Sequence, residues 1–279
     1  MNVVPLEKNT SSLTILRHRM SQVLPHQVLQ FVKKQYYAQR LKVVTEYAEP
    51  DLIVVKCFVQ PGECALDVGA NVGIYTKFLS HWVGAEGRVY SIEPVPMTFE
   101  ILRNNIRRLG LNNVRAISCA ASETSGFAAI GIPVWPSGAE NFSRAAIVEK
   151  DTQSSLRHVQ VRTVTLDSLL AEISAEISMG VSFIKLDVEG HELQCIKGAS
   201  EIIRRWRPAW MVETWGDPRD ETDAAHRIFH LMKVQGYEPF WFDKKALIKY
   251  RPGHRSMNFW FLTPENLVKL RRRGCPVNE

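Results

Sequence analysis

The sequence lacks any run of about 20 apolar residues, the length that a membrane-spanning helix requires. Its first twelve residues, MNVVPLEKNTSS, contain no apolar core of the kind that a cleaved secretion signal has. The five cysteines include no CxxC pair, so neither a structural zinc site nor a disulfide framework is indicated. These absences predict a soluble, cytoplasmic protein without a transmembrane segment, whose cysteines are small buried side chains.

Charge is spread unevenly along the 279 residues, which carry a formal net charge of +6. Residues 1–50 sum to +4, residues 51–243 to −5 and residues 244–273 to +8. A solvated surface is the simpler interpretation of the basic C-terminal part, and peripheral contact with an anionic surface is the alternative. Because the central region is acidic, we do not expect a nucleic-acid partner. We assign no oligomeric state.

Hydrophobic patterning predicts an α/β fold. From residue 61 the sequence alternates short β-rich apolar runs with amphipathic helical patterns, which is typical of a parallel sheet with crossover helices. The predicted parallel strands are 63–68, 88–93, 114–119, 181–187 and 208–213. Two later runs, 237–243 and 258–263, have no helix between them and therefore predict an antiparallel pair that ends the sheet.

Three regions are expected along the chain: a helical extension over 1–60, a domain over 61–264 and a basic tail over 265–279. Within the domain, residues 124–160 show no clear helical period. We expect them to form an inserted loop or hairpin over the carboxyl edge of the sheet. Long loops in compact domains usually carry function.

The segment LDVGANVGIY (66–75) has the pattern of a ligand-binding turn between a strand and a helix. Asp67 ends the buried strand, and Gly69 and Gly73 let the backbone turn sharply and approach a ligand. Asn71 stands where a dinucleotide-binding turn has its middle glycine, which disfavours a nicotinamide cofactor.

The ends of the next two strands indicate a nucleoside. Glu93 ends the second strand, where a carboxylate can accept hydrogen bonds from a ribose diol; a solvent-facing glutamate before a turn is the alternative. The third strand ends in small residues, among them Ala120 and Ser122, which leave space for an adenine ring. These residues predict a cofactor that contains adenosine.

Several motifs in order resemble the FkbM-type family of S-adenosylmethionine-dependent methyltransferases: DVGANVG (67–73), IEP (92–94), VTLDSLL (164–170), IKLDVEGHE (184–192) and RPAWMVE (207–213). The resemblance covers about residues 62–214. It implies a Rossmann-like class I methyltransferase fold, with a seven-stranded, mostly parallel sheet, a C-terminal antiparallel hairpin and helices on both faces. It also implies S-adenosyl-L-methionine as cofactor and O-methylation of a small-molecule or saccharide acceptor: a sugar, glycan, glycolipid or polyketide-type natural product.

Candidate catalytic residues follow the fourth parallel strand. Asp187 is the strongest, because open α/β sheets place their ligands at the carboxyl ends of central strands. Glu189 lies two residues on, and His191 can take up a proton near neutral pH. A favourable charge at a helix N-terminus is an equally good interpretation of Glu189, and a capping or surface role is an equally good one of His191.

Acceptor contacts are expected from Glu213, which ends the fifth strand, from Trp135, which can stack on a sugar ring, and from Asn141. Asp187 with Glu213 could hold a magnesium ion, but we do not favour this and assign no metal ligands.

Two other functions stay open. A nucleic-acid or protein methyltransferase fits the basic pI, although the Asn/Asp-Pro-Pro-Tyr/Phe and Pro-Cys motifs of many nucleic-acid enzymes are missing. The second alternative is a non-catalytic module that binds S-adenosylmethionine. The motif residues Asp67, Gly69, Gly73, Glu93 and Asp187 are all present, which argues against this alternative.

Overall fold

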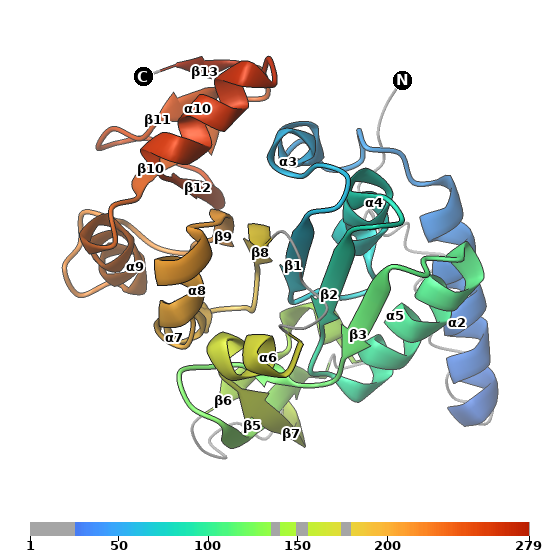
Figure 1. Ribbon diagram of the computed structural model, residues 1–279. Coiled ribbons are helices and arrows are strands. Elements are labelled where there is room, and N and C mark those ends of the chain that lie inside the picture. Colours follow the sequence, from blue (N-terminus) through green and yellow to red (C-terminus); the bar gives the residue numbers. More distant parts are fainter. Residues whose placement is uncertain (1–25, 135–139, 149–155, 174–179, 279) are drawn as a thin grey trace.

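The computed structural model describes residues 26–134, 140–148, 156–173 and 180–278 (Figure 1). Its central feature is a nine-stranded mixed sheet with the order β13-β11-β10-β12-β9-β8-β1-β2-β3. The strands are β1 (Cys64–Val68), β2 (Arg88–Ile92), β3 (Val114–Ile117), β8 (Val181–Leu186), β9 (Ala209–Glu213), β10 (Glu238–Phe242), β11 (Leu247–Lys249), β12 (Asn258–Leu262) and β13 (Val277–Asn278).

The predicted α/β class is confirmed, and the sheet differs from the expectation in detail. β3, β2, β1, β8 and β9 are mutually parallel, as predicted. β12 lies between β9 and β10 and is antiparallel to both. The sheet has nine strands rather than seven, because β11 and β13 pair beyond β10.

Helices cover both faces of this sheet (Figure 1). One face packs against α3 (Leu52–Phe58), α4 (Ile74–Val83) and α10 (Pro264–Arg272). The other packs against α6 (Leu166–Ile173), α7 (Glu192–Lys197), α8 (Ser200–Trp206) and α9 (Ala224–Val234). Because side chains alternate along a strand, Leu66 and Val68 enter the second core while Ala65 enters the first.

A second, smaller sheet occupies the region expected to be an inserted loop or hairpin. It has the order β4-β7-β5-β6, formed by β4 (Ala120–Ala121), β5 (Gly126–Pro133), β6 (Ala146–Val148) and β7 (Leu156–Val164), with a 3-10 turn η1 (Phe142–Arg144) before β6. Its apolar face, which includes Ile130, Ile132 and Val161, packs on Val95 at the edge of the central sheet. This packing places β5, η1 and β6 over one side of the candidate site.

The N-terminal region docks onto the domain through α2 (His26–Val43), which packs along α5 (Pro96–Leu109) (Figure 1). Lys77 of α4 caps the C-terminal end of α2. Its ammonium donates to the main-chain oxygens of Leu41 (2.9 Å) and Val44 (2.7 Å). The chain then continues through α3 along the first face of the sheet.

The basic C-terminal residues are part of the fold. Thr263 starts α10 with a reciprocal capping box to Asn266, and β13 then pairs parallel to β11. No helix in the described part of the chain is both long and apolar enough to cross a bilayer. All five cysteines are free thiols, and four of them are buried.

Candidate active site

A cavity of about 450 Å³ opens at the carboxyl ends of β1, β2, β8 and β9, beneath the second sheet. It is within the range of small-molecule and cofactor sites. Its lining residues are Glu49, Val68, Gly69, Asn71, Ile92, Glu93, Pro94, Val95, Cys119, Ala120, Ala121, Ile130, Phe142, Ala145, Ile147, Asp187, Val188, Glu189, His191 and Glu213.

The turn after β1 forms one wall of this cavity. Gly69 has a φ of +77°, and a Cβ built on it would lie 1.7 Å from the main-chain oxygen of Asp187. Only glycine therefore allows the turn after β1 and the end of β8 to approach each other this closely. Asn71 follows in the left-handed region, with a φ of +50°.

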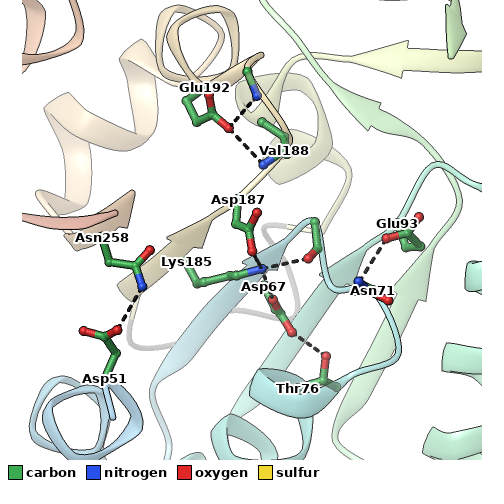
Figure 2. A network of polar contacts seen from close by, with 12 residues as sticks. Asp51, Asp67, Asn71, Thr76, Glu93, Lys185, Asp187, Val188, Glu192 and Asn258 are labelled. Atoms are coloured by element: carbon green, nitrogen blue, oxygen red, sulfur yellow. Dashed lines mark hydrogen bonds and ion pairs between the residues drawn. The ribbon is translucent and has the colours of Figure 1, made fainter. Parts of the chain in front are cut away.

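Glu93 lies at the cavity with each carboxylate oxygen already fixed by one donor. The main-chain N–H group of Asn71 donates to one of its oxygens at 3.0 Å (Figure 2), and that of Val95 donates to the other at 2.9 Å. Burial raises the pKa of Glu93 to about 7, although these hydrogen bonds act to lower it. A carboxylate oxygen accepts more than one hydrogen bond, so this side chain is oriented and still able to accept from a ribose diol.

Small and apolar side chains line the part of the cavity beside Glu93. Ala120 and Ala121 come from β4, Ile130 from β5 and Phe142 from η1. These small and apolar side chains and the oriented carboxylate fit an adenosine. The residues present thus match the nucleoside part of S-adenosylmethionine.

A pair of carboxyl groups lies at the ends of β8 and β9. Carboxylate oxygens of Asp187 and Glu213 lie within 4.8 Å of each other, and each group shifts the pKa of the other. Burial and this contact with Asp187 raise the pKa of Glu213 to about 8. Burial acts to raise the pKa of Asp187 as well, but Lys185 and the hydrogen bond with Glu213 bring it below its ordinary value. At neutral pH Asp187 is therefore the ionised member of the pair.

In the segment after Asp187, Glu189 and His191 line the cavity, whereas Glu192 stabilises the turn before α7. Burial is the main cause that raises the pKa of Glu189 to about 7, and repulsion from Asp187 adds to it. The backbone of Glu189 lies in the left-handed region, with a φ of +53°. His191 begins α7, its Nε2 lies 3.0 Å from Ser122 Oγ, and burial lowers its pKa. Glu192 accepts from the N–H groups of Val188 and Gly190, both at 3.1 Å, which closes this turn (Figure 2).

The sequence analysis did not single out Lys185, which lies behind the cavity lining, nor Glu49 and Phe142, which line the cavity. The Lys185 ammonium lies 3.0 Å from Asp187 Oδ2 and 3.7 Å from Asp67 Oδ1, and it donates to the main-chain oxygen of Gly69 at 2.7 Å (Figure 2). The side chain is 4% exposed. The signal in the sequence is a single cation within the apolar strand VSFIKL, because a buried charge requires partners.

Four of the residues expected at the site do not line the cavity. Asp67 is fully buried under α4, where Thr76 Oγ1 donates to it at 2.6 Å. Gly73 is the N-cap residue of α4. Ser122 is hydrogen-bonded to His191, which itself lines the cavity. Asn141 directs its main-chain N–H to Pro133, and its neighbour Phe142 lines the cavity instead. Trp135 lies outside the described residues.

Carboxylate oxygens of Asp187, Glu189 and Glu213 lie within 4.8 Å of one another, a spacing compatible with a cation. Asp187 is, however, already paired with the Lys185 ammonium, and the raised pKa of Glu213 favours its protonated form, which is a poor metal ligand. We therefore assign no metal ligands.

Comparison with known proteins gives one family match and several distant relatives. The methyltransferase FkbM domain matches residues 67–239. Methyltransferase sdnD of Sordaria araneosa is 21% identical over 227 residues, which cover 73% of this chain and 85% of that protein. A protein-L-isoaspartate O-methyltransferase of Methanococcoides burtonii is 23% identical over 150 residues, 44% of this chain and 73% of that protein.

Solved structures with a similar arrangement include methyltransferase FkbM from Methylobacillus flagellatus, with a TM-score of 0.45 and 17% identity. That comparison covers 89% of this chain and 59% of the other, so this chain spans less than two thirds of the Methylobacillus protein. An O-methyltransferase from Bacillus cereus in complex with SAH has a TM-score of 0.45 and 15% identity, over 88% of this chain and 96% of that one.

Proposed function

This chain belongs to the FkbM family of S-adenosylmethionine-dependent methyltransferases, and we propose that it methylates a hydroxyl of a sugar, a glycan or glycolipid, or a polyketide-type natural product. The observation that carries the proposal is the Asp187–Glu213 pair. One cavity is lined both by an oriented acid, Glu93, and by this pair of carboxyl groups, whose pKa values are shifted in opposite directions.

Cofactor binding is assigned to the residues at the nucleoside end. Gly69 and Asn71 form the turn, Glu93 accepts from the ribose hydroxyls, and Ala120 with Ala121 faces the adenine. S-adenosylmethionine, when bound, supplies a methyl group made electrophilic by its sulfonium. The same acidic cavity favours that positive charge, since its lining includes five carboxyl groups and, among the described residues, no lysine or arginine.

Asp187 is the proposed base. Methyl transfer to an oxygen requires that the hydroxyl lose its proton as the bond to carbon forms. Asp187 can receive this proton, because Lys185 keeps it ionised while Glu213 holds the proton of the pair. Glu189 and His191 line the same cavity and are the next candidates.

The acidic lining also bears on the acceptor. A carboxylate acceptor, as the name of the isoaspartate methyltransferase relative indicates for that protein, would meet the ionised Asp187 in this cavity and be repelled. A phosphate-rich nucleic acid would be disfavoured for the same reason. Neutral polyols, by contrast, hydrogen-bond readily to carboxylates, which supports a saccharide hydroxyl.

The proposal is tested by incubating the protein with methyl-labelled S-adenosylmethionine and a panel of acceptors. The panel contains free sugars, nucleotide sugars, a glycolipid, a macrolide aglycone, an isoaspartyl peptide and an RNA oligomer. We expect label in a saccharide or macrolide hydroxyl. Label in the peptide or the RNA alone would contradict the proposal.

A further inference from the structure

The buried Lys185 joins two parts of the site that are far apart in the sequence. Gly69 belongs to the turn that follows β1, whereas Asp187 follows β8. The Lys185 ammonium contacts both, at 2.7 Å to the Gly69 oxygen and 3.0 Å to Asp187 Oδ2 (Figure 2). We infer that Lys185 is a positioning residue, which fixes the cofactor-binding turn to the proposed base. This inference rests on the role of Asp187 in the proposed function.

The strand register explains how this contact arises. β1 and β8 are neighbouring parallel strands in which Asp67 stands beside Lys185. Side chains of alternate residues share one face, so Lys185 and Asp67 both point under α4, towards Tyr75 and Thr76. The ammonium extends from there to the carboxyl end of the sheet, where Gly69 and Asp187 lie.

The charges around Lys185 explain why the contact is strong. Burial acts to lower the pKa of Lys185, but Asp187 and Asp67 raise it above its ordinary value, so the side chain stays charged. A charged donor gives stronger and shorter hydrogen bonds than a neutral one. The Gly69 oxygen is therefore held by the Lys185 ammonium. Because the same ammonium pairs with Asp187, a shift of the turn would also move the Asp187 carboxylate.

Other ionisable groups face Asp187 and contribute to its charge state. Those described are Glu49 from the segment before α3, Asp67 on β1, Tyr75 on α4, Glu189 and Glu192 after β8, and Glu213 on β9. All of these groups are acids, whereas Lys185 brings a positive charge to Asp187. Removal of the Lys185 charge is thus expected to make Asp187 harder to ionise, by about 1–3 pH units for a contact of this kind.

The test uses Lys185→Met together with Asp67→Asn, so that the fully buried Asp67 carboxylate is not left without a cation. Thr76 can still donate to Asn at position 67, which favours folding of both Asp67→Asn and the double variant. Calorimetry measures the affinity for S-adenosylmethionine and for S-adenosylhomocysteine between about pH 5 and pH 9. The first ligand is a sulfonium and the second is neutral, so their ratio reports the ionisation of the acids near Asp187.

In the wild type we expect the ratio to favour S-adenosylmethionine increasingly as the pH rises. In the double variant the midpoint of this change should move up by about 1 pH unit or more, and S-adenosylhomocysteine should bind about 10-fold more weakly because the turn is no longer held. Asp67→Asn alone removes a competing acid, so its midpoint should move to lower pH. This single variant decides the question if the double variant does not fold.

Lys77→Met is the matched control. Lys77 also donates to main-chain oxygens, those of Leu41 and Val44, but it does not line the cavity. Its loss should lower the melting temperature and leave both affinities and the midpoint unchanged. A midpoint that stays at its wild-type position in the Asp67→Asn and double variants would overturn the inference. Since no acceptor is used, failure to methylate a saccharide would contradict only the proposed function.

Discussion

The Cα of Gly69 faces the main chain of Asp187 so closely that a Cβ would lie 1.7 Å from the Asp187 oxygen. The cofactor-binding turn and the proposed base therefore touch through their backbones as well as through Lys185. A substitution that moves the turn at Gly69 should therefore also move Asp187, and a substitution that moves Asp187 should also move the turn.

Gly69→Ala should abolish S-adenosylmethionine binding and strongly destabilise the fold, because the added methyl group must displace the end of β8. Gly110→Ala is the control: Gly110 also has a left-handed φ, +65°, but nothing lies within 4 Å of its Cβ position. It should cost only about 1 kcal/mol of stability and leave binding intact. Calorimetry and thermal denaturation measure both effects, and equal losses in the two variants would refute the steric argument.

Glu93→Ala should weaken the binding of S-adenosylmethionine and S-adenosylhomocysteine by about 1–3 kcal/mol, since a buried hydrogen-bonding partner is lost. Affinity for the uncharged product should also fall as the pH drops through about 7, where Glu93 takes up a proton. Glu100→Ala, which removes a half-exposed acid on α5, is the control and should bind both ligands normally. Unchanged affinity in Glu93→Ala would exclude the ribose role.

Stability of the ligand-free protein should fall as the pH rises from about 4.5, the ordinary pKa of a glutamate, to about 8. The pKa of Glu93 and of Glu189 is raised to about 7 and that of Glu213 to about 8, so the folded state holds protons that the unfolded state has already lost. This stabilisation is present at low pH and is lost as the pH passes these values. The melting temperature should decline by a few degrees across this window.

Glu213→Gln removes one of these titrations, so its melting temperature should decline less over the same window. A matched substitution, Glu238→Gln, removes an exposed acid on β10 and should follow the wild-type curve. A wild-type decline in Glu213→Gln would show that the Asp187–Glu213 pair does not titrate in this range.

Asp187→Asn should lower the rate of methyl transfer by about 10²–10⁴-fold, the range typical of general base catalysis. The fold should be retained, because Lys185 keeps its hydrogen bond to Gly69 and its neighbour Asp67. The rate is measured with the acceptor that the labelling panel identifies, and Glu192→Gln tests whether loss of any nearby acid is enough. Wild-type turnover in Asp187→Asn would make Glu189 or His191 the next candidate.

Arg273→Glu should destabilise the protein by about 1–3 kcal/mol, because Arg273 donates to the Cys57 main-chain oxygen at 2.8 Å and lies 3.4 Å from Glu63 Oε1. Arg272→Glu changes the same charge at an exposed position and should alter stability by less than about 0.5 kcal/mol. If acceptor recognition depends on the basic surface, both variants should weaken it in a salt-dependent way. Equal stability of the two variants would show that Arg273 does not anchor the C-terminal segment.

Much of the central sheet could be predicted from the sequence, because buried strands and amphipathic helices leave a local pattern in the chain. The parallel strands, the glycine turn and the acid Glu93 all lie where local spacing indicated them. The place of β12 between β9 and β10 could not be predicted in this way, because strand order depends on pairing between distant segments. The second sheet was missed for a related reason, because its long strands β5 and β7 pair with each other across a long intervening segment of the chain.

The sequence by itself determined the local parts of the site: a turn that only glycine permits, an acid at the end of β2 and an acid at the end of β8. Only the tertiary structure decided which of these parts act together. It directed Asp67 inward to Thr76, set Phe142 over the cavity and placed the Lys185 ammonium between Gly69 and Asp187. The physical reason is that the direction of a side chain follows from its own strand, whereas its partners follow from the register of the neighbouring strand.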